Sequence, residues 1–154
     1  MNFSSTGRII ALDVGQRRIG IAISDALGIT AQGLPTLTRT RIREDLQHLD
    51  ALARDREAVR FVLGHPLHMS GRESRQAEYV KEFGARLSEY TGLPVEYRDE
   101  RLTTVEASRV LRSSGIGREK RAQAVDKLSA VLILESYLAG SAIPVAAASE
   151  EGDV

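Results

Sequence analysis

Two apolar, β-branched runs, residues 8–12 and 19–24, stand near the start of the chain and are joined by the short gap DVGQRR. Runs of this kind on either side of a glycine-containing gap are typical of a β-hairpin. The chain is therefore expected to begin with two antiparallel strands. Asp13 stands at the end of the first run, where a carboxylate is costly to desolvate unless a positive group meets it.

The rest of the chain alternates between strand and helix patterns. Gly33 and Pro35 predict that a third strand is an edge strand. The expected elements are a strand within residues 29–40, a helix from residue 42 to residues 54–56, a strand at 58–64, a helix opened by a Ser70–Glu73 capping box, a strand at 94–98, a helix at 102–115 and a helix at 123–138. This order predicts an α/β fold with a mixed five-stranded sheet, its first three strands antiparallel, flanked by helices.

The last predicted helix is expected to bury one apolar face, formed by Leu128, Val131, Leu132 and Leu138. With 154 residues the chain is long enough for one self-sufficient core, and we expect a single domain at residues 1–140. Residues 141–154 have little to bury and are expected to form a flexible C-terminal tail.

Composition narrows the possible functions. The chain has no cysteine, which excludes disulfides and thiolate zinc sites. No apolar run approaches the ~20 residues of a membrane span, so we expect a cytoplasmic protein with no membrane partner. The 21 basic and 21 acidic residues balance, which is unlike a nonspecific nucleic-acid binder. However, 18 of the basic residues are arginine, whose planar side chain suits bidentate contact with phosphate.

Three acidic residues stand at notable positions. Asp13 ends the first strand, Glu100 follows the last strand, and Asp126 lies in the first turns of the last helix. If the first and last strands are parallel, Asp13 and Glu100 share the sheet edge where α/β proteins bind ligands. Three converging carboxylates repel one another unless a hard divalent cation neutralises them. The pattern favours metal-assisted hydrolysis of a phosphodiester.

Each acid also has a purely structural explanation. Asp13 could accept hydrogen bonds in the turn that follows it. Glu100 could pair with Arg98 or Arg101 on the surface. Asp126 could be an acid favoured by the dipole at a helix N-terminus. Only the coincidence of all three at one sheet edge favours the metal site.

Two other segments have open interpretations. His65 and His68 could bind a transition metal, but two histidines without a third ligand are more often part of an ordinary loop. The basic residues Arg118, Lys120 and Arg121 follow a glycine-bearing stretch that starts at residue 113. This segment is either a clamp over a nucleic-acid backbone or a solvated linker.

Four segments, DVGQRRIGIAISD, GHPLHMSG, DERLTTVEA and VDKLSAVLILESYL, resemble in order and spacing the signature segments of the YqgF-type family. Members of this family are described as pre-16S ribosomal RNA nucleases or as Holliday junction resolvases. The resemblance covers about residues 8–138. It implies a ribonuclease-H-like fold and a catalytic, metal-binding set, Asp13, Glu100 and Asp126, that holds Mg²⁺ or Mn²⁺.

The resemblance also suggests residues for turn formation and nucleic-acid contact. Gly15 and Gly20 match the first motif, and we expect them to shape its turn. In the second motif His65, His68 and Ser70 replace the leucine, asparagine and aspartate common in the family, so that loop adds no acid. The residues expected to bind nucleic acid are Arg17, Arg18, Arg101, Thr103, Thr104, Arg118, Lys120 and Arg121.

The leading hypothesis is a divalent-metal nuclease that processes the 5′ end of pre-16S ribosomal RNA. A Holliday junction resolvase acting on branched DNA is the enzymatic alternative, and it requires a dimer to cut both strands of a symmetric junction. Monomer and homodimer both remain open. A third hypothesis is a non-catalytic RNA-binding module in ribosome assembly or transcription. ATP binding ranks low, because ATPases with a similar first motif bind nucleotide between two such domains.

Overall fold

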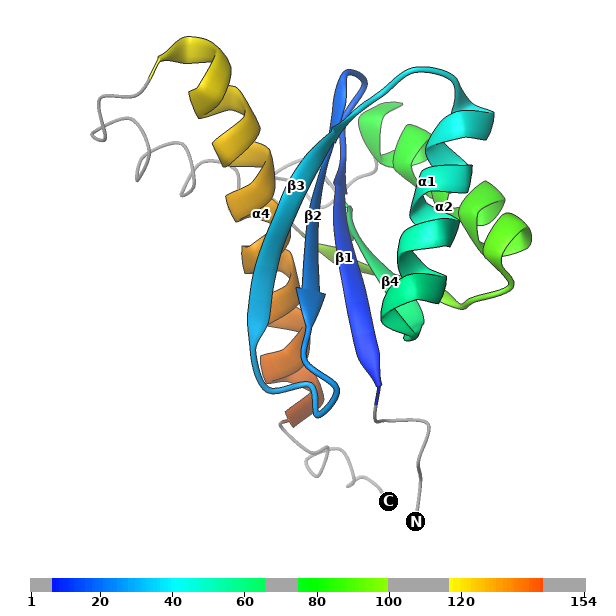
Figure 1. Cartoon of the computed structure of the whole chain (residues 1–154), viewed down its shortest axis with the longest axis vertical. Coiled ribbons are helices and arrows are strands. Elements are labelled where there is room, and N and C mark those ends of the chain that lie inside the picture. Colours follow the sequence, from blue (N-terminus) through cyan, green and yellow to red (C-terminus); the bar gives the residue numbers. More distant parts are fainter. Residues whose placement is uncertain (1–6, 66–74, 100–116, 143–154) are drawn as a thin grey trace.

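The computed structural model describes residues 7–65, 75–99 and 117–142 (Figure 1). The predicted helix at 102–115, the Ser70–Glu73 capping box and the tail from residue 143 lie outside these residues. The described elements are β1 (Arg8–Val14), β2 (Arg18–Ser24), β3 (Ala31–Thr38), α1 (Ile42–Arg56), β4 (Ala58–His65), α2 (Arg75–Thr91), β5 (Val95–Asp99) and α4 (Arg118–Ala142).

The five strands form one mixed sheet in the order β3-β2-β1-β4-β5. β1 pairs antiparallel with β2, and β2 pairs antiparallel with β3. β4 is parallel to β1, and β5 is parallel to β4. The predicted mixed sheet is therefore confirmed, with β3 as an edge strand. The parallel pairing brings the C-terminal ends of β1, β4 and β5 to the same end of the sheet, where these strands terminate.

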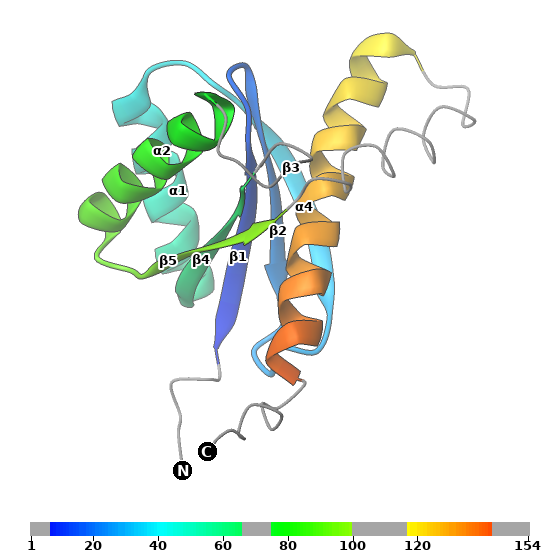
Figure 2. The ribbon, with the colours of Figure 1, turned by 180° about the vertical axis from the view of Figure 1, so that it is seen from behind.

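Helices cover both faces of the sheet, with α1 and α2 on one face and α4 on the other (Figures 1 and 2). Side chains alternate between these faces along each strand. Ile10 and Leu12 of β1 belong to the larger aliphatic cluster, together with Leu49 of α1 and Leu87 of α2. Their neighbours Ile9 and Ala11 belong to a smaller cluster that packs against α4. Asp13 continues this second set of alternating positions.

Small residues on the face of the sheet covered by α4 allow this helix to approach the sheet closely. Ala11 and Ala22 are fully buried partners at the centre of this face. A Cβ atom added at Gly20 would overlap the backbone carbonyl of Asp126, and one at Gly33 would overlap the side chain of Lys127. The path of α4 over β2 and β3 therefore depends on the absence of side chains at these two glycines.

The buried face of α4 agrees only in part with the predicted one. It is centred on Ala130, Ile133 and Leu134, which are essentially inaccessible to solvent. All four predicted residues are partly buried, and two of them, Val131 and Leu138, pack against this centre. The helix carries apolar residues on several sides, so its periodicity did not identify the face that packs on the sheet. None of the helices in the described ranges, α4 included, is long and apolar enough to cross a membrane.

Polar side chains also connect α4 to β5. The Arg98 guanidinium donates to the Ser136 hydroxyl at 3.1 Å and to the Ser136 carbonyl at 2.9 Å. The Tyr137 hydroxyl donates to Glu96 at 3.0 Å, and Arg60 of β4 pairs with the same carboxylate at 2.5 Å. These contacts secure the later turns of α4 across the parallel half of the sheet.

Candidate functional site

Asp13 lies in strand β1, one residue before its end, and its backbone is paired with that of Gly20 in β2. Its side chain is half-buried on the face covered by α4. The hairpin turn that follows is closed by the Gly15 amide, which donates to the Arg18 carbonyl at 2.9 Å. Asp13 therefore stands in the sheet, and the turn has its own closing hydrogen bond.

Asp126 lies in α4 at the point where the helix contacts Gly20. Its side chain is half-buried, and its Oδ2 accepts a hydrogen bond from Nε of Arg18 at 2.6 Å. Since Gly20 pairs with Asp13, the two acids come from distant parts of the sequence to neighbouring positions around one glycine. The interpretation of Asp126 as a helix N-terminal acid is wrong, because α4 begins at Arg118 and Asp126 lies beyond its first turn.

Glu100, the third predicted acid, lies outside the described residues. The strand before it, β5, is parallel to β1 through β4, as the prediction required. Arg98, one of the two surface partners considered for Glu100, binds Ser136 of α4. The other considered partner, Arg101, also lies outside the described residues. The structure thus brings two of the three predicted acids together, while the position of the third stays a prediction.

The chemistry of the described donors fits a hard cation. Asp13 and Asp126 offer carboxylate oxygens, the ligands that Mg²⁺ and Mn²⁺ prefer. Both side chains are half-buried at the end of the sheet, where solvent still reaches them. Across the parts of the chain that the structure covers, no group of three metal-ligating side chains occurs, so a complete metal site needs at least one further ligand.

A network around Arg39 fixes the turn that follows Asp13. The Arg39 guanidinium donates to the Gly15 carbonyl at 3.0 Å and to the Asp45 carboxylate at 3.0 Å, and it hydrogen-bonds to the Tyr79 hydroxyl. The side chains of Arg39 and Asp45 are only 10% and 2% exposed. This buried ion pair links the β1–β2 turn to both α1 and α2.

Two further contacts hold the same turn. The Gln76 side-chain amide donates to the Val14 carbonyl at 3.1 Å, and the backbone amide of Arg39 donates to the Arg17 carbonyl at 2.9 Å. Sequence reasoning missed the roles of Arg39, Asp45 and Gln76. Asp45 did carry a signal, since it is an acid three residues after Ile42 on the apolar side of a predicted helix.

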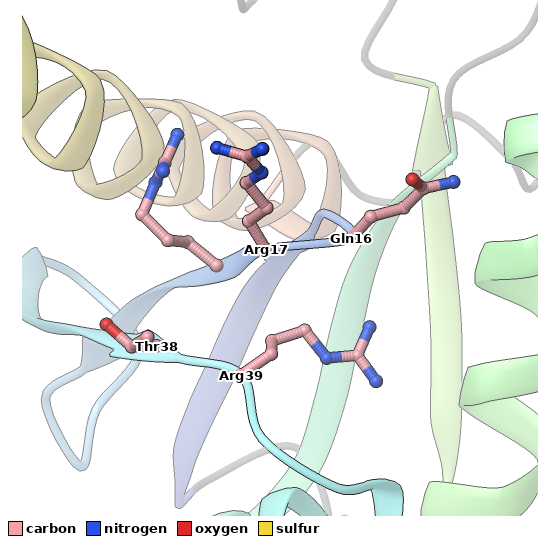
Figure 3. Close-up of a pocket in the computed structure, with 5 residues that line it drawn as sticks. Gln16, Arg17, Thr38 and Arg39 are labelled. Carbon is pink, nitrogen blue, oxygen red and sulfur yellow. The ribbon is translucent and has the colours of Figure 1, made fainter.

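An open pocket of about 340 Å³ lies beside this turn and is lined by Gln16, Arg17, Arg18, Thr38 and Arg39 (Figure 3). Figure 3 shows the side chains of Arg17, in the β1–β2 turn, and Arg39, just after β3, extending in different directions. Arg17 is exposed to solvent. Arg39 is held by Asp45, and Arg18 is paired with Asp126. The pocket therefore combines positive charge with direct proximity to one of the predicted metal ligands.

The basic residues after Gly117 form the first turns of α4. Arg118 and Lys120 are exposed, and Arg121 is half-buried. The interpretation of residues 118–123 as a solvated linker is wrong, because this part of the segment is helical. This end of α4 and the β1–β2 turn lie at the same end of the molecule (Figures 1 and 2).

The remaining residues of that segment, 113–116, lie outside the described part of the chain. Three residues predicted to contact nucleic acid, Arg101, Thr103 and Thr104, also lie outside it. Two predicted nucleic-acid contacts, Arg17 and Arg18, are on the turn and at the start of β2. The structure therefore places five of the eight predicted contacts, all of them at the end of the molecule that carries the two acids.

His65 is the last residue of β4 rather than part of a loop. Its ring lies 5.7 Å from that of Tyr97, centroid to centroid, on the face of the sheet covered by α2. Asp13 lies on the opposite face, so His65 does not join the two acids. His68 lies outside the described residues. The aromatic contact gives His65 a packing role.

Solved structures identify the fold. The chain is similar to T. thermophilus RuvC in complex with Holliday junction substrate, with a TM-score of 0.57 and 10% identity over 89% of this chain and 97% of that chain. It is also similar to the Fowlpox virus resolvase in complex with Holliday junction DNA, with a TM-score of 0.54 and 11% identity over 87% of this chain and 98% of that chain. The protein therefore has the ribonuclease-H-like fold of RuvC-type resolvases.

Residues 7–140 match the model of the RuvX family, described as Holliday junction resolvase, and the chain belongs to this family. A relative from Koribacter versatilis is 53% identical over 132 residues, 86% of each chain. A relative from Heliobacterium modesticaldum is 47% identical over 131 residues, 85% of this chain and 88% of the relative. Both are named "Putative pre-16S rRNA nuclease". Family membership defines a hydrolytic nuclease, a class that acts on nucleic acid.

Proposed function

We propose that the protein is a nuclease that processes the 5′ end of pre-16S ribosomal RNA during ribosome biogenesis and uses Mg²⁺ or Mn²⁺. The observation that carries this proposal is the meeting of Asp13 and Asp126 around Gly20 at the end of the sheet. The names of the relatives from Koribacter versatilis and Heliobacterium modesticaldum support the choice of substrate. With this function, we expect the protein to work in the cytoplasm.

In the proposed mechanism Asp13, Glu100 and Asp126 are the catalytic residues and hold the metal. A divalent ion held there would supply an activated water and would stabilise negative charge on the scissile phosphate. Asp13 is held by the β1–β2 ladder, and Asp126 by the close contact of α4 with Gly20. The protein thereby presents carboxylate oxygens from rigid elements, which keeps the reacting groups in a fixed geometry.

Basic residues orient the RNA in this proposal. Arg17, Arg118 and Lys120 are exposed at the end of the molecule that carries the acids, and they can each neutralise a backbone phosphate. The remaining proposed contacts are Arg18, Arg101, Thr103, Thr104 and Arg121. The network around Arg39 holds the turn that bears Arg17, so Arg17 reaches the substrate from a fixed support.

The description of the RuvX family favours a second candidate, a Holliday junction resolvase. Cutting a symmetric four-way junction requires two sites related by two-fold symmetry, so this function needs a homodimer. Sedimentation with and without junction DNA tests it. A particle that remains monomeric under both conditions would exclude the resolvase, whereas the RNA nuclease can act as a monomer or a homodimer.

The experiment that tests the proposed function compares the wild type with Asp13→Asn on two substrates. Each protein is incubated with Mg²⁺ or Mn²⁺ and a labelled pre-16S RNA or a four-way DNA junction. Loss of a metal ligand removes several kcal/mol of transition-state stabilisation, so we expect RNA cleavage to fall by about a thousandfold. Asp55→Asn is the matched control, because Asp55 is 79% exposed on α1, and it should cleave like the wild type.

The result separates three functions. Cleavage of the RNA by the wild type and its loss in the Asp13 variant support the proposal. Cleavage of the junction alone supports the resolvase. Full RNA cleavage by a well-folded Asp13→Asn protein would overturn the assignment of the acids, and RNA binding without metal-dependent cleavage would indicate the non-catalytic module.

A further inference from the structure

Arg18 contacts Asp126, the proposed metal ligand, and also lines the pocket beside the β1–β2 turn. Its Nε donates to Oδ2 of Asp126 at 2.6 Å, and its side chain also lines the pocket formed with Gln16, Arg17 and Thr38. The side chains of Arg18 and Asp126 are 25% and 21% exposed. Solvent and ions therefore reach the pair, and the structure leaves room on the pocket side for the guanidinium to move.

The contact with Arg18 occupies one of the two carboxylate oxygens that Asp126 offers to the proposed metal site. Asp126 has two carboxylate oxygens, and Arg18 uses one of them. A divalent cation beside that carboxylate would repel the guanidinium, because like charges a few ångströms apart in a half-buried site are strongly unfavourable. Arg18 and the ion therefore compete for Asp126.

The pocket offers Arg18 a second position with suitable chemistry. Arg39 contributes positive charge there but is fixed by its buried pair with Asp45. Arg17 is exposed and stands directly before Arg18 at the turn. A phosphate group in this pocket would meet two adjacent arginines, whose planar donor groups match phosphate oxygens. Arg18 can thus exchange a carboxylate partner for a phosphate partner by a change of side-chain rotamer.

We propose that Arg18 couples the metal site to a phosphate site in this pocket. Without a divalent ion, Arg18 neutralises Asp126 and blocks it. With the ion bound, Arg18 turns into the pocket and binds a backbone phosphate of the nucleic acid. Because coupling between two ligands is reciprocal, the ion and the nucleic acid increase each other's affinity. This inference rests on the proposed function, since it takes Asp126 as a metal ligand.

The first test measures Mn²⁺ affinity of the full chain without nucleic acid, from the electron paramagnetic resonance signal of free Mn²⁺. Arg18→Gln removes the competing charge, and we expect it to bind Mn²⁺ about tenfold more tightly than the wild type, a change of about 1.4 kcal/mol. Arg17→Gln is the matched control, because Arg17 lies in the same pocket but does not pair with Asp126. Its Mn²⁺ affinity should stay within about twofold of the wild type.

The second test measures binding of a fluorescent single-stranded RNA by anisotropy, in Ca²⁺ and in EDTA. Ca²⁺ takes the same carboxylate ligands. The wild type should bind RNA more tightly with the ion than without it. Arg17→Gln should weaken RNA binding under both conditions and keep the ratio between them. For Arg18→Gln, the ratio of the RNA affinity in Ca²⁺ to that in EDTA should fall close to one, because the residue that links the two sites is gone.

The outcomes separate this proposal from the proposed function. Equal Mn²⁺ affinity of the wild type and Arg18→Gln would overturn the coupling. Wild-type Mn²⁺ affinity in Asp126→Asn would instead overturn Asp126 as a metal ligand.

If thermal melting shows that Arg18→Gln is unfolded, Arg18→Lys replaces it. Lysine keeps the charge but is a point donor on a more flexible stem, so its Mn²⁺ affinity should exceed that of the wild type by a smaller factor; an affinity equal to or below that of the wild type would overturn the proposal.

Discussion

Replacing Gly20 by alanine should disturb the fold and the site together. A Cβ atom at this position would overlap the carbonyl of Asp126, closer than the 3.0 Å below which some atom must shift. The obstacle is the backbone of a helix, which cannot turn aside as a flexible side chain can. Either α4 moves away from β2 or the β1–β2 ladder distorts beside Asp13. Both responses separate the two acids.

The size of the effect follows from two opposing terms. Overpacking of a well-packed interior costs about 1–3 kcal/mol, and a backbone obstacle belongs at the upper end of that range. Alanine recovers about 0.5–1 kcal/mol, because glycine loses more conformational entropy on folding. We therefore expect the free energy of unfolding to fall by about 2 kcal/mol. At this chain length, that change lowers the melting temperature by about 4–8 °C.

The activity should fall by more than the stability does. A displacement of about 1 Å at a catalytic group can reduce the rate about a hundredfold, so RNA cleavage by Gly20→Ala should decrease by about that factor at a temperature where the variant is folded. Urea unfolding and metal-dependent cleavage are measured on the same preparation. Gly117→Ala is the matched control, because no atom of the described residues lies within 4 Å of its added Cβ atom. Alanine is less favourable than glycine at the residue before a helix, so the free energy of unfolding of this control should fall by about 1 kcal/mol at most.

Two results would refute this reasoning. A Gly20→Ala protein with wild-type stability and activity would mean that α4 does not depend on the close approach at Gly20. A variant that loses stability but cleaves at the wild-type rate would mean that the position of Asp126 does not limit catalysis.

Two further predictions concern the polar contacts. Asp45→Asn leaves Arg39 without its carboxylate partner in a buried position and should lower the free energy of unfolding by about 3–5 kcal/mol; urea denaturation measures this, and a loss below 1 kcal/mol would contradict the role of the pair. Partial burial and the hydrogen bond to Glu96 raise the pKa of Tyr137 above its ordinary value of 10.0. The folded state therefore holds the phenol proton more tightly than the unfolded state, so the stability that Tyr137 contributes is present below pH 10 and is lost as pH rises above it. In thermal melts from pH 9 to 11, Tyr137→Phe should lose less stability than the wild type, and equal losses would count against this contribution.

The elements that the sequence predicted well are those with short-range signals. The two β-branched runs around DVGQRR became β1 and β2, and Gly33 and Pro35 correctly marked β3 as an edge strand. The apolar spacing from Ile42 to Leu52 predicted α1 nearly to its last residue. In each case a local pattern of turn residues or periodicity is enough to specify the element.

The buried face of α4 was predicted only in part, because its packing is decided by a partner distant in sequence. A helix with apolar residues on several sides has no single dominant stripe, and the glycines of β2 and β3 select which side fits. The same limitation applies to the site. Asp13 and Asp126 were predicted as site residues from their positions, but the pair between Arg18 and Asp126 joins residues 108 positions apart. No local sequence pattern indicates a contact between residues so far apart.

The two faces of the sheet have different tolerance for change. On the face covered by α1 and α2, large aliphatic side chains such as Leu49 and Leu87 fill the interior, and many combinations of similar volume can replace them. On the face covered by α4, there is no space for a side chain at Gly20, because the backbone of Asp126 lies against it. Repacking the first face is therefore a route to a more thermostable enzyme that leaves the reaction untouched, while changes beneath α4 must be made in compensating pairs.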